Sequence, residues 1–175
     1  INFCALSTAK GMTVNMNIKV FRIDDRLIHG QIVTSWISDA EAEKIIVVDD
    51  LAAKDEFQQS LLRMATPSSI KLCIYSIEDF VEKLKNDNSS ENVLLIVRGP
   101  AQALKLLEGG LDVDTINVGN ISMKKGKKKV LPFLWLDDSE VNSLKEIANK
   151  NVKLDVRSIP NNRSQDAIDL INKYY

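Results

Sequence analysis

Residues 18–32 read IKVFRIDDRLIHGQI, and this stretch decides how the rest of the chain is interpreted. Apolar residues recur through Ile23, which predicts a β-strand. The strand ends in two acids and an arginine, residues 24–26, and His29 follows three residues later with Gly30 directly behind it. His29 is the only histidine in the chain. This order predicts a histidine on a loop between the end of a strand and the start of a helix.

The same alternation of short apolar runs and helical patterns continues along the chain. Strands are expected at 18–24, 44–49, 70–75, 93–97, 115–118, 130–136 and 152–156. Helices are expected near 30–38, 54–65, 77–85, 100–108, 139–149 and 163–173. Runs such as IIVV and VLLIV are apolar throughout, which is typical of strands buried on both faces of a parallel sheet.

The alternation implies βαβ units, and therefore a single α/β domain with an open, mostly parallel seven-stranded sheet and helices on both faces. The pattern breaks at one place. No helix fits between Val118 and Val130, so we expect a loop there, and one of these two strands could run antiparallel.

Composition limits the possible functions. A chain of 175 residues forms one domain large enough to bury a core, and a net charge of -1 argues against a protein whose main task is to coat nucleic acid. Cys4 and Cys73 have no metal-ligand spacing, and with a single histidine they argue against a zinc site. We expect no metal and no cofactor.

Location is predicted from apolar stretches and from the first residues. No stretch approaches the ~18 consecutive apolar residues of a membrane span. Residues 1–15 are expected to be an upstream or appended segment, with the native start at Met12 or Met16, so the functional domain is assigned to 16–175. These features predict a cytoplasmic protein.

Polar residues follow several of the expected strands. In an open sheet of parallel strands, ligands bind outside the carboxyl ends of the strands. Residues 24–29, Asp49, Ser76, Arg98 and Asn120 would all lie at that edge. The predicted architecture therefore places His29 where chemistry is expected.

A histidine nucleophile that works without a metal or a serine suits phosphoryl transfer. The phosphoryl oxygens need donors, which Arg26 and loop amides near Gly30 could supply. Either Asp24 or Asp25 could accept a hydrogen bond from the other ring nitrogen and fix its tautomer. The N-terminus of the following helix would also favour an anion. The plain alternative is a solvated turn with a local ion pair and an ordinary histidine.

The segment RIDDRLIHGQI closely resembles the active-site loop of the IIB component of the mannose/fructose/sorbose family of the bacterial phosphoenolpyruvate-dependent sugar phosphotransferase system. KIIVVDD, LLIVRGP, LEGGLDVDTINVGN and KLDVRSIP resemble other IIB segments in the expected order, so the resemblance covers about residues 16–175. It implies the seven-stranded α/β fold already expected. It also implies a cytoplasmic protein associated peripherally with a membrane transporter.

The resemblance further implies a protein-Nπ-phosphohistidine–sugar phosphotransferase. His29 would accept phosphate on Nδ1 from a IIA phosphohistidine and pass it to the sugar imported by the membrane IIC and IID subunits. Asp24 would orient the ring, and Arg26 would neutralise the phosphoryl group. One departure is Asn120, where relatives commonly carry a second glycine.

The lysine-rich segment and two further arginines each have more than one possible role. The lysine-rich segment 124–129 could dock an acidic IIA surface, lie near anionic lipid or simply be solvated. Arg98 and Arg157 could reach the phosphate or lie on an ordinary surface. We expect His29 on a shallow, exposed face, with segment 124–129 flanking it.

Two rival classes are weaker. A receiver domain also has an acidic pair after its first strand, but this chain lacks the aspartate and lysine that such a domain needs after its third and fifth strands. A nucleic-acid-binding module using the lysine-rich segment conflicts with the near-neutral charge and the lack of interleaved aromatic residues.

Overall fold

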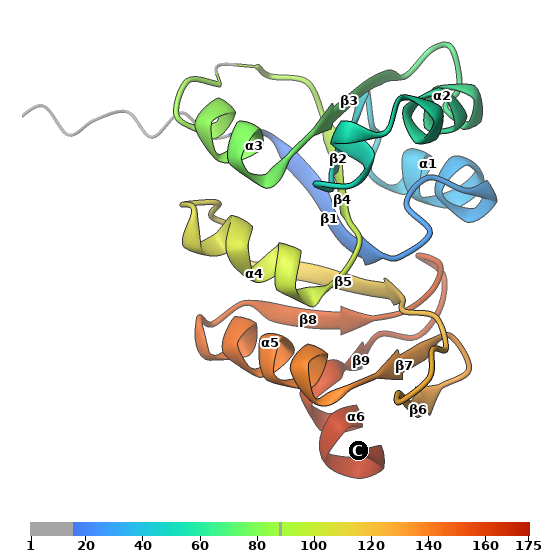
Figure 1. The fold of residues 1–175 in the computed structure, drawn as a ribbon, viewed down its shortest axis with the longest axis vertical. Coiled ribbons are helices and arrows are strands. Elements are labelled where there is room, and N and C mark those ends of the chain that lie inside the picture. The colour runs from blue at the N-terminus through green and yellow to red at the C-terminus, as the bar shows by residue number, and fades with distance from the viewer. Residues whose placement is uncertain (1–15, 88) are drawn as a thin grey trace, which may run out of the picture.

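A computed structural model describes residues 16–87 and 89–175 of the protein (Figure 1). The expected upstream segment 1–15, including Met12, lies outside the described residues. The central sheet has, from edge to edge, β3 (Lys71–Tyr75), β2 (Lys44–Val48), β4 (Val93–Val97), β1 (Ile18–Asp24), β5 (Thr115–Asn120), β8 (Lys153–Val156) and β9 (Gln165–Asp166). Only β9 pairs antiparallel with its neighbour. The prediction of an open, mostly parallel seven-stranded sheet is confirmed.

Helices cover both faces of the sheet, as expected. The helical elements are a π-helical turn (Ile32–Trp36) running into α1 (Ile37–Asp39), a 3-10 turn (Ala52–Lys54), α2 (Glu56–Ala65), α3 (Ile77–Leu84), α4 (Pro100–Glu108), α5 (Asp138–Asn149) and α6 (Ala167–Tyr174). Helices α3, α4 and α5 lie side by side over one face (Figure 1). Buried residues of α3 to α6 pack in one core cluster, and those of the π-helical turn and α2 pack in a second.

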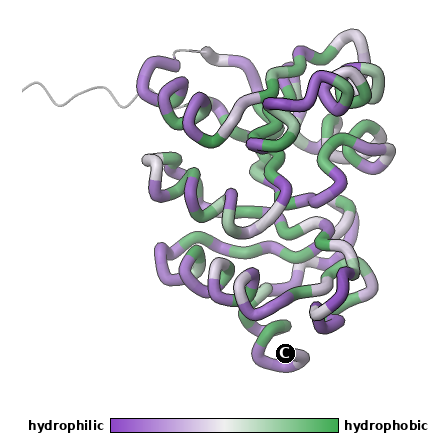
Figure 2. The backbone as a smooth tube through the Cα atoms, in the orientation of Figure 1, coloured by the Kyte–Doolittle hydropathy of each residue, from purple (hydrophilic) through white to green (hydrophobic). Residues whose placement is uncertain are grey.

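The two clusters follow from the alternation of side chains along each strand. Every residue of β2 and β4 is buried. In β2, Ile46 and Val48 join the cluster under α3 to α6, whereas Ile45 and Val47 join the cluster under α2. The strands are correspondingly hydrophobic in the interior of the molecule (Figure 2). Burial on both faces is the reason why these runs read as continuously apolar.

The expected strand at 130–136 is not part of the central sheet. It is split into β6 (Lys128–Leu131) and β7 (Leu134–Leu136), which form a separate antiparallel hairpin. Pro132 lies in the turn between them, where its missing N–H and fixed φ interrupt the strand. The loop expected after β5 is confirmed, because residues 122–127 contain no helix.

The seventh strand comes instead from the start of the helix expected at 163–173. Residues 165–166 form β9, and α6 begins only at Ala167. The Asp166 carboxylate accepts hydrogen bonds from the backbone N–H groups of Ile168 and Asp169. This N-cap fixes the helix start, so that Gln165 and the backbone of Asp166 pair with β8.

The described residues contain no helix that is both long and apolar enough to cross a membrane. The longest, α5, has 12 residues and begins with a capping box between Asp137 and Glu140.

A bulge in β5 shapes the sheet beside the end of β1. Ile23 pairs with Val118, but Asp24 pairs with Asn120, so Gly119 is an extra residue on β5. A Cβ atom placed on Gly119 would lie 2.0 Å from Cζ of Arg22. Glycine is therefore required here because the buried Arg22 guanidinium lies against the backbone.

We expect Gly119→Ala to lower the free energy of unfolding by about 2–3 kcal/mol, because the new methyl group overlaps a side chain that is packed on all sides. Gly30→Ala is the matched control. A Cβ atom on Gly30 meets nothing within 4 Å, so this variant should change stability by less than about 0.5 kcal/mol. Urea unfolding of both variants measures the difference, and equal stabilities would contradict the steric argument.

Candidate active site

The loop after β1 reverses the chain in one tight turn. The backbone N–H of Leu27 donates to the carbonyl oxygen of Asp24 at 3.0 Å, and Leu27 has a φ of 58°, in the left-handed region. This conformation costs a non-glycine residue energy. Burial of Leu27 and Ile28 in the cluster under α2 offsets that cost. The reversal returns His29 to the end of β1.

A helical segment begins immediately after the histidine. The carbonyl oxygen of His29 accepts from the N–H of Val33 at 3.2 Å, and residues 30–39 are helical with a π-helical turn in the middle. The helix expected near 30–38 is therefore confirmed. Its free N–H groups lie next to His29, where they favour an anion.

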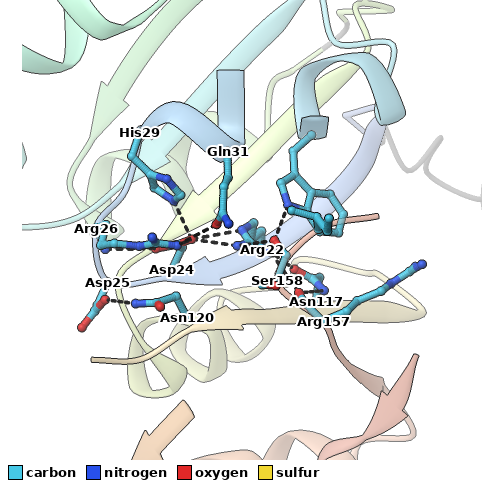
Figure 3. Close-up of polar contacts among 12 residues, drawn as sticks. Arg22, Asp24, Asp25, Arg26, His29, Gln31, Asn117, Asn120, Arg157 and Ser158 are labelled. Atoms are coloured by element: carbon cyan, nitrogen blue, oxygen red, sulfur yellow. Dashed lines mark hydrogen bonds and ion pairs between the residues drawn. The ribbon is translucent and has the colours of Figure 1, made fainter. Parts of the chain in front are cut away.

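His29 and Arg26 both contact the Asp24 carboxylate, as Figure 3 shows. Nε2 of His29 lies 2.8 Å from Oδ2 of Asp24. The backbone N–H and Nε of Arg26 donate to Oδ1, and Nη2 donates to Oδ2 at 3.2 Å. Asp24 is fully buried, whereas the side chains of His29 and Arg26 are 17% and 39% exposed. The structure thus brings together all three residues selected from the sequence, and His29 is not sealed in the core.

The surroundings of Asp24 keep it ionised. Burial raises the pKa of this carboxyl, but the hydrogen bonds from His29 and Arg26 and the charge of Arg22 outweigh burial and hold the pKa at about 2. An ionised carboxylate only accepts hydrogen bonds, so Nε2 of His29 must carry the proton in their contact. In the neutral imidazole, Nδ1 is then the ring nitrogen with a free lone pair.

Arg22 also contacts the Asp24 carboxylate, and it was not among the site residues predicted from the sequence. Its Nε and Nη2 donate to Oδ2 of Asp24, at 3.3 and 2.8 Å. Nη1 donates to Oδ1 of Asn117 at 2.5 Å and to the carbonyl of Arg157 at 3.3 Å, and Nη2 donates to the carbonyl of Ser158 at 3.1 Å. Figure 3 shows these contacts at the end of β1.

The sequence did contain a signal for Arg22. It lies between Phe21 and Ile23 in an apolar strand, two residues before Asp24, so alternation puts Arg22 and Asp24 on the same face. A buried charge needs a partner, and the two would have been expected to pair. Arg22 also stacks on Trp36, with Cζ 4.7 Å from the ring centroid. Trp36 is buried, and it comes from the π-helical turn after the loop.

Asp25, the alternative partner for the histidine, turns toward β5 instead. Its Oδ1 accepts from Nδ2 of Asn120 at 2.8 Å, and its Oδ2 accepts from the N–H of Ser122 at 2.8 Å. Asn120 therefore ties the loop to the end of β5. Asp24 rather than Asp25 contacts the imidazole.

The two other arginines considered from the sequence have structural partners. Arg98 donates to Asp49 through Nε at 2.6 Å and to the carbonyl of Asp25 through Nη1 at 3.1 Å. Arg157 donates to Asp155 at 2.6 Å. Arg98 thus braces the backbone of the loop that carries His29, and Arg157 is held on β8.

Segment 124–129 flanks the site only at its beginning. Ser122, two residues before the segment, contacts Asp25, so the segment begins close to the loop that carries His29. Lys127, however, pairs with Glu140 of α5, and the Lys128 ammonium lies 4.2 Å from the centroid of the Tyr175 ring. Lys129 lies over the ring of Trp135. Much of the basic charge is therefore engaged with the C-terminal half of the domain.

No group of three or more His, Cys, Asp or Glu side chains within residues 16–87 and 89–175 is arranged to hold a metal ion. The site consists of a histidine backed by a carboxylate, with one exposed and one buried arginine.

This arrangement is that of an α/β domain with its reactive group on a loop at the carboxyl ends of parallel strands. Residues 18–175 match the family described as PTS system sorbose subfamily IIB component. The chain belongs to this family of phosphotransferase-system IIB components, as the resemblance of residues 22–32 predicted.

Two known relatives match over nearly their whole length and a third over about half of its length. The sorbose-specific EIIB component of Klebsiella pneumoniae is 34% identical over 159 residues, which cover 90% of this chain and 97% of that protein. The fructose-specific EIIB component of Bacillus subtilis is 30% identical, covering 89% of this chain and 96% of that protein. The mannose-specific EIIAB component of Escherichia coli is 31% identical, covering 97% of this chain but 53% of that protein.

Solved structures agree with the fold. The IIB domain of the sorbose permease from Klebsiella pneumoniae superimposes with a TM-score of 0.87 at 34% identity, covering 90% of this chain and 98% of that chain. The N-acetylgalactosamine-specific IIB component 1 of Escherichia coli gives a TM-score of 0.81 at 31% identity, covering 86% and 99%.

The depressed pKa of Asp24 predicts a pH-dependent stability. The ionised form is favoured in the folded state, so its contribution is complete above the ordinary pKa of 3.8 and is lost as the pH falls toward about 2. The contribution at neutral pH is about 2 kcal/mol. Urea unfolding should show that the stability advantage of the native protein over Asp24→Asn shrinks between about pH 4 and pH 2. A constant difference across that range would contradict the assignment.

Proposed function

We propose that this chain accepts a phosphoryl group on His29 from a IIA phosphohistidine and transfers it to a sugar imported by membrane subunits. The contact between His29 Nε2 and the ionised Asp24 carries the proposal, because it holds the proton of the neutral imidazole on Nε2 and leaves the Nδ1 lone pair for nucleophilic attack. Family membership supports it, since IIB components are phosphotransferases.

The first transfer exchanges one phosphorus–nitrogen bond for another. The Nδ1 lone pair of His29 attacks phosphorus, the bond to the donor nitrogen breaks, and the bonding pair returns to the donor imidazole. His29 then carries positive charge on its ring, which the Asp24 carboxylate stabilises through Nε2–H. In the second transfer, a sugar hydroxyl oxygen attacks phosphorus and releases its proton to water, the bond between phosphorus and Nδ1 breaks, and the bonding pair returns to His29.

Arg26 is suited to hold the phosphoryl oxygens. Its Nε and Nη2 contact Asp24 and Gln31, and its side chain is 39% exposed beside His29. The guanidinium can therefore donate from Nη1 toward solvent while it stays anchored. A charge-assisted bond there stabilises the negative charge of the group in transfer.

The partners follow from the two transfers. A IIA domain or protein donates the phosphoryl group, and the membrane IIC and IID subunits present the sugar, so the domain works in the cytoplasm at the membrane transporter. The relatives are named as specific for sorbose, fructose, N-acetylgalactosamine and mannose. Such varied sugars favour a IIB site that serves the shared phosphoryl step rather than sugar recognition.

His29→Ala should abolish phosphorylation, because His29 is the only imidazole in the chain. The assay is incubation with phosphoenolpyruvate, the general phosphotransferase proteins and a matching IIA. The native protein should gain one phosphate that is labile in acid and stable in base, whereas an aspartyl phosphate would be lost in base. Full labelling of His29→Ala would reject the proposal.

Arg26→Ala should slow phosphoryl transfer from IIA by roughly 30- to 1000-fold, which corresponds to about 2–4 kcal/mol of transition-state stabilisation. The transfer rate of Arg26→Lys should lie between those of the native protein and Arg26→Ala, since lysine keeps the charge but loses the planar guanidinium. The exposed Arg163, on the loop before β9, gives a matched control in Arg163→Ala. Single-turnover rates measure the effect, and a native rate in Arg26→Ala would remove this residue from the site.

A further inference from the structure

We infer that Arg22 is a positioning residue for His29. Arg22 acts through Asp24, and it leaves Arg26 available to bind the phosphoryl group. The inference rests on the proposed function of His29. Arg22 and His29 both contact the Asp24 carboxylate (Figure 3).

Arg22 cannot itself bind the phosphoryl group. Its side chain has no exposed surface, and its five N–H groups face five contacts, two of them on Asp24. The other acceptors are Asn117 on β5 and the carbonyls of Arg157 and Ser158 after β8. A guanidinium anchored to three separate segments stays in place while the reaction proceeds.

The shared oxygen explains how Arg22 acts on the histidine. Oδ2 of Asp24 lies 2.8 Å from Nη2 of Arg22 and 2.8 Å from Nε2 of His29. Arg22 therefore fixes the carboxylate oxygen that receives the imidazole proton. When that oxygen is fixed, the ring keeps its tautomer and directs Nδ1 outward.

Arg22 and Arg26 have different electrostatic roles. Asp24 carries one negative charge, and Arg22 offsets it inside the protein, where the pair is fully buried. Arg26 then retains a net positive charge at the surface, available to the incoming phosphoryl oxygens. Without Arg22, Arg26 would be the only arginine on the carboxylate among the described residues, and its contact with phosphate would compete with that role.

The surroundings are specific for arginine. Trp36 stacks on the guanidinium, and Trp36 Nε1 donates to the Ser158 carbonyl that also accepts from Arg22. Gly119 leaves the space in which the flat group lies. A lysine ammonium has three donors and no planar face, so it cannot reproduce these contacts.

The test combines a rate with a spectroscopic signature of the ring. Because His29 is the only histidine, ¹⁵N NMR of the labelled imidazole reports its tautomer without ambiguity. The native protein should show the Nε2–H tautomer. Arg22→Met should give a mixture of tautomers and slow transfer from phosphorylated IIA by about 10- to 100-fold, the range for partners that orient a reactive histidine. Arg22→Lys should recover only part of both, and Arg163→Met is the control.

A double-mutant cycle separates positioning from general damage. In an Asp24→Asn background, Arg22→Met should change the rate by less than about twofold, because the carboxylate through which Arg22 acts is absent. An equal loss in both backgrounds, or a native tautomer and rate in Arg22→Met, would overturn the inference. If Arg22→Met does not fold, Arg22→Lys decides it, and a native tautomer and rate in that variant reject it.

The phosphorylation assay and the tautomer measurement test the proposed function and the role of Arg22 separately. Absence of phosphate on His29 in the native protein would reject the function. The tautomer measurements need no partner protein, so they would still test the coupling of Arg22 to His29.

Discussion

One buried carboxylate organises the site. Asp24 accepts from Arg22, Arg26 and His29, and without these partners an ionised aspartate with no exposed surface would be strongly disfavoured. The interaction is reciprocal, because the same contacts that keep Asp24 charged hold each partner in place. A rigid donor set around His29 lowers the reorganisation that the proposed phosphoryl transfer requires.

The sheet supplies the positions from which these groups converge. Arg22 and Asp24 point to one face of β1, while Phe21 and Ile23 point to the core under α3 to α6. The bulge at Gly119 then gives the arginine room beside β5. Apolar packing on one face of β1 thus fixes the location of a polar cluster on the other.

Much of this arrangement could be predicted from local patterns. The strand, loop and helix around His29 are encoded within residues 18–39, and the alternation of elements indicates the parallel sheet. The split into β6 and β7 and the two-residue β9 were missed, because short strands at the margin depend on a single turn or cap at Pro132 or Asp166. The bonds from Arg22 to Asn117 and Ser158 were also beyond the sequence, since only the folded sheet brings residues 95 and 136 positions apart together.

The wide sequence separation of the Arg22 contacts has a consequence for biosynthesis. Arg22 and His29 are synthesised before the Ser158 carbonyl, which lies 136 residues after Arg22 and completes the cluster. A nascent chain that lacks β8 therefore displays the imidazole without the support that fixes its proton. Because Arg22, Asp24 and His29 share these contacts, the placement of the imidazole proton depends on completion of the sheet.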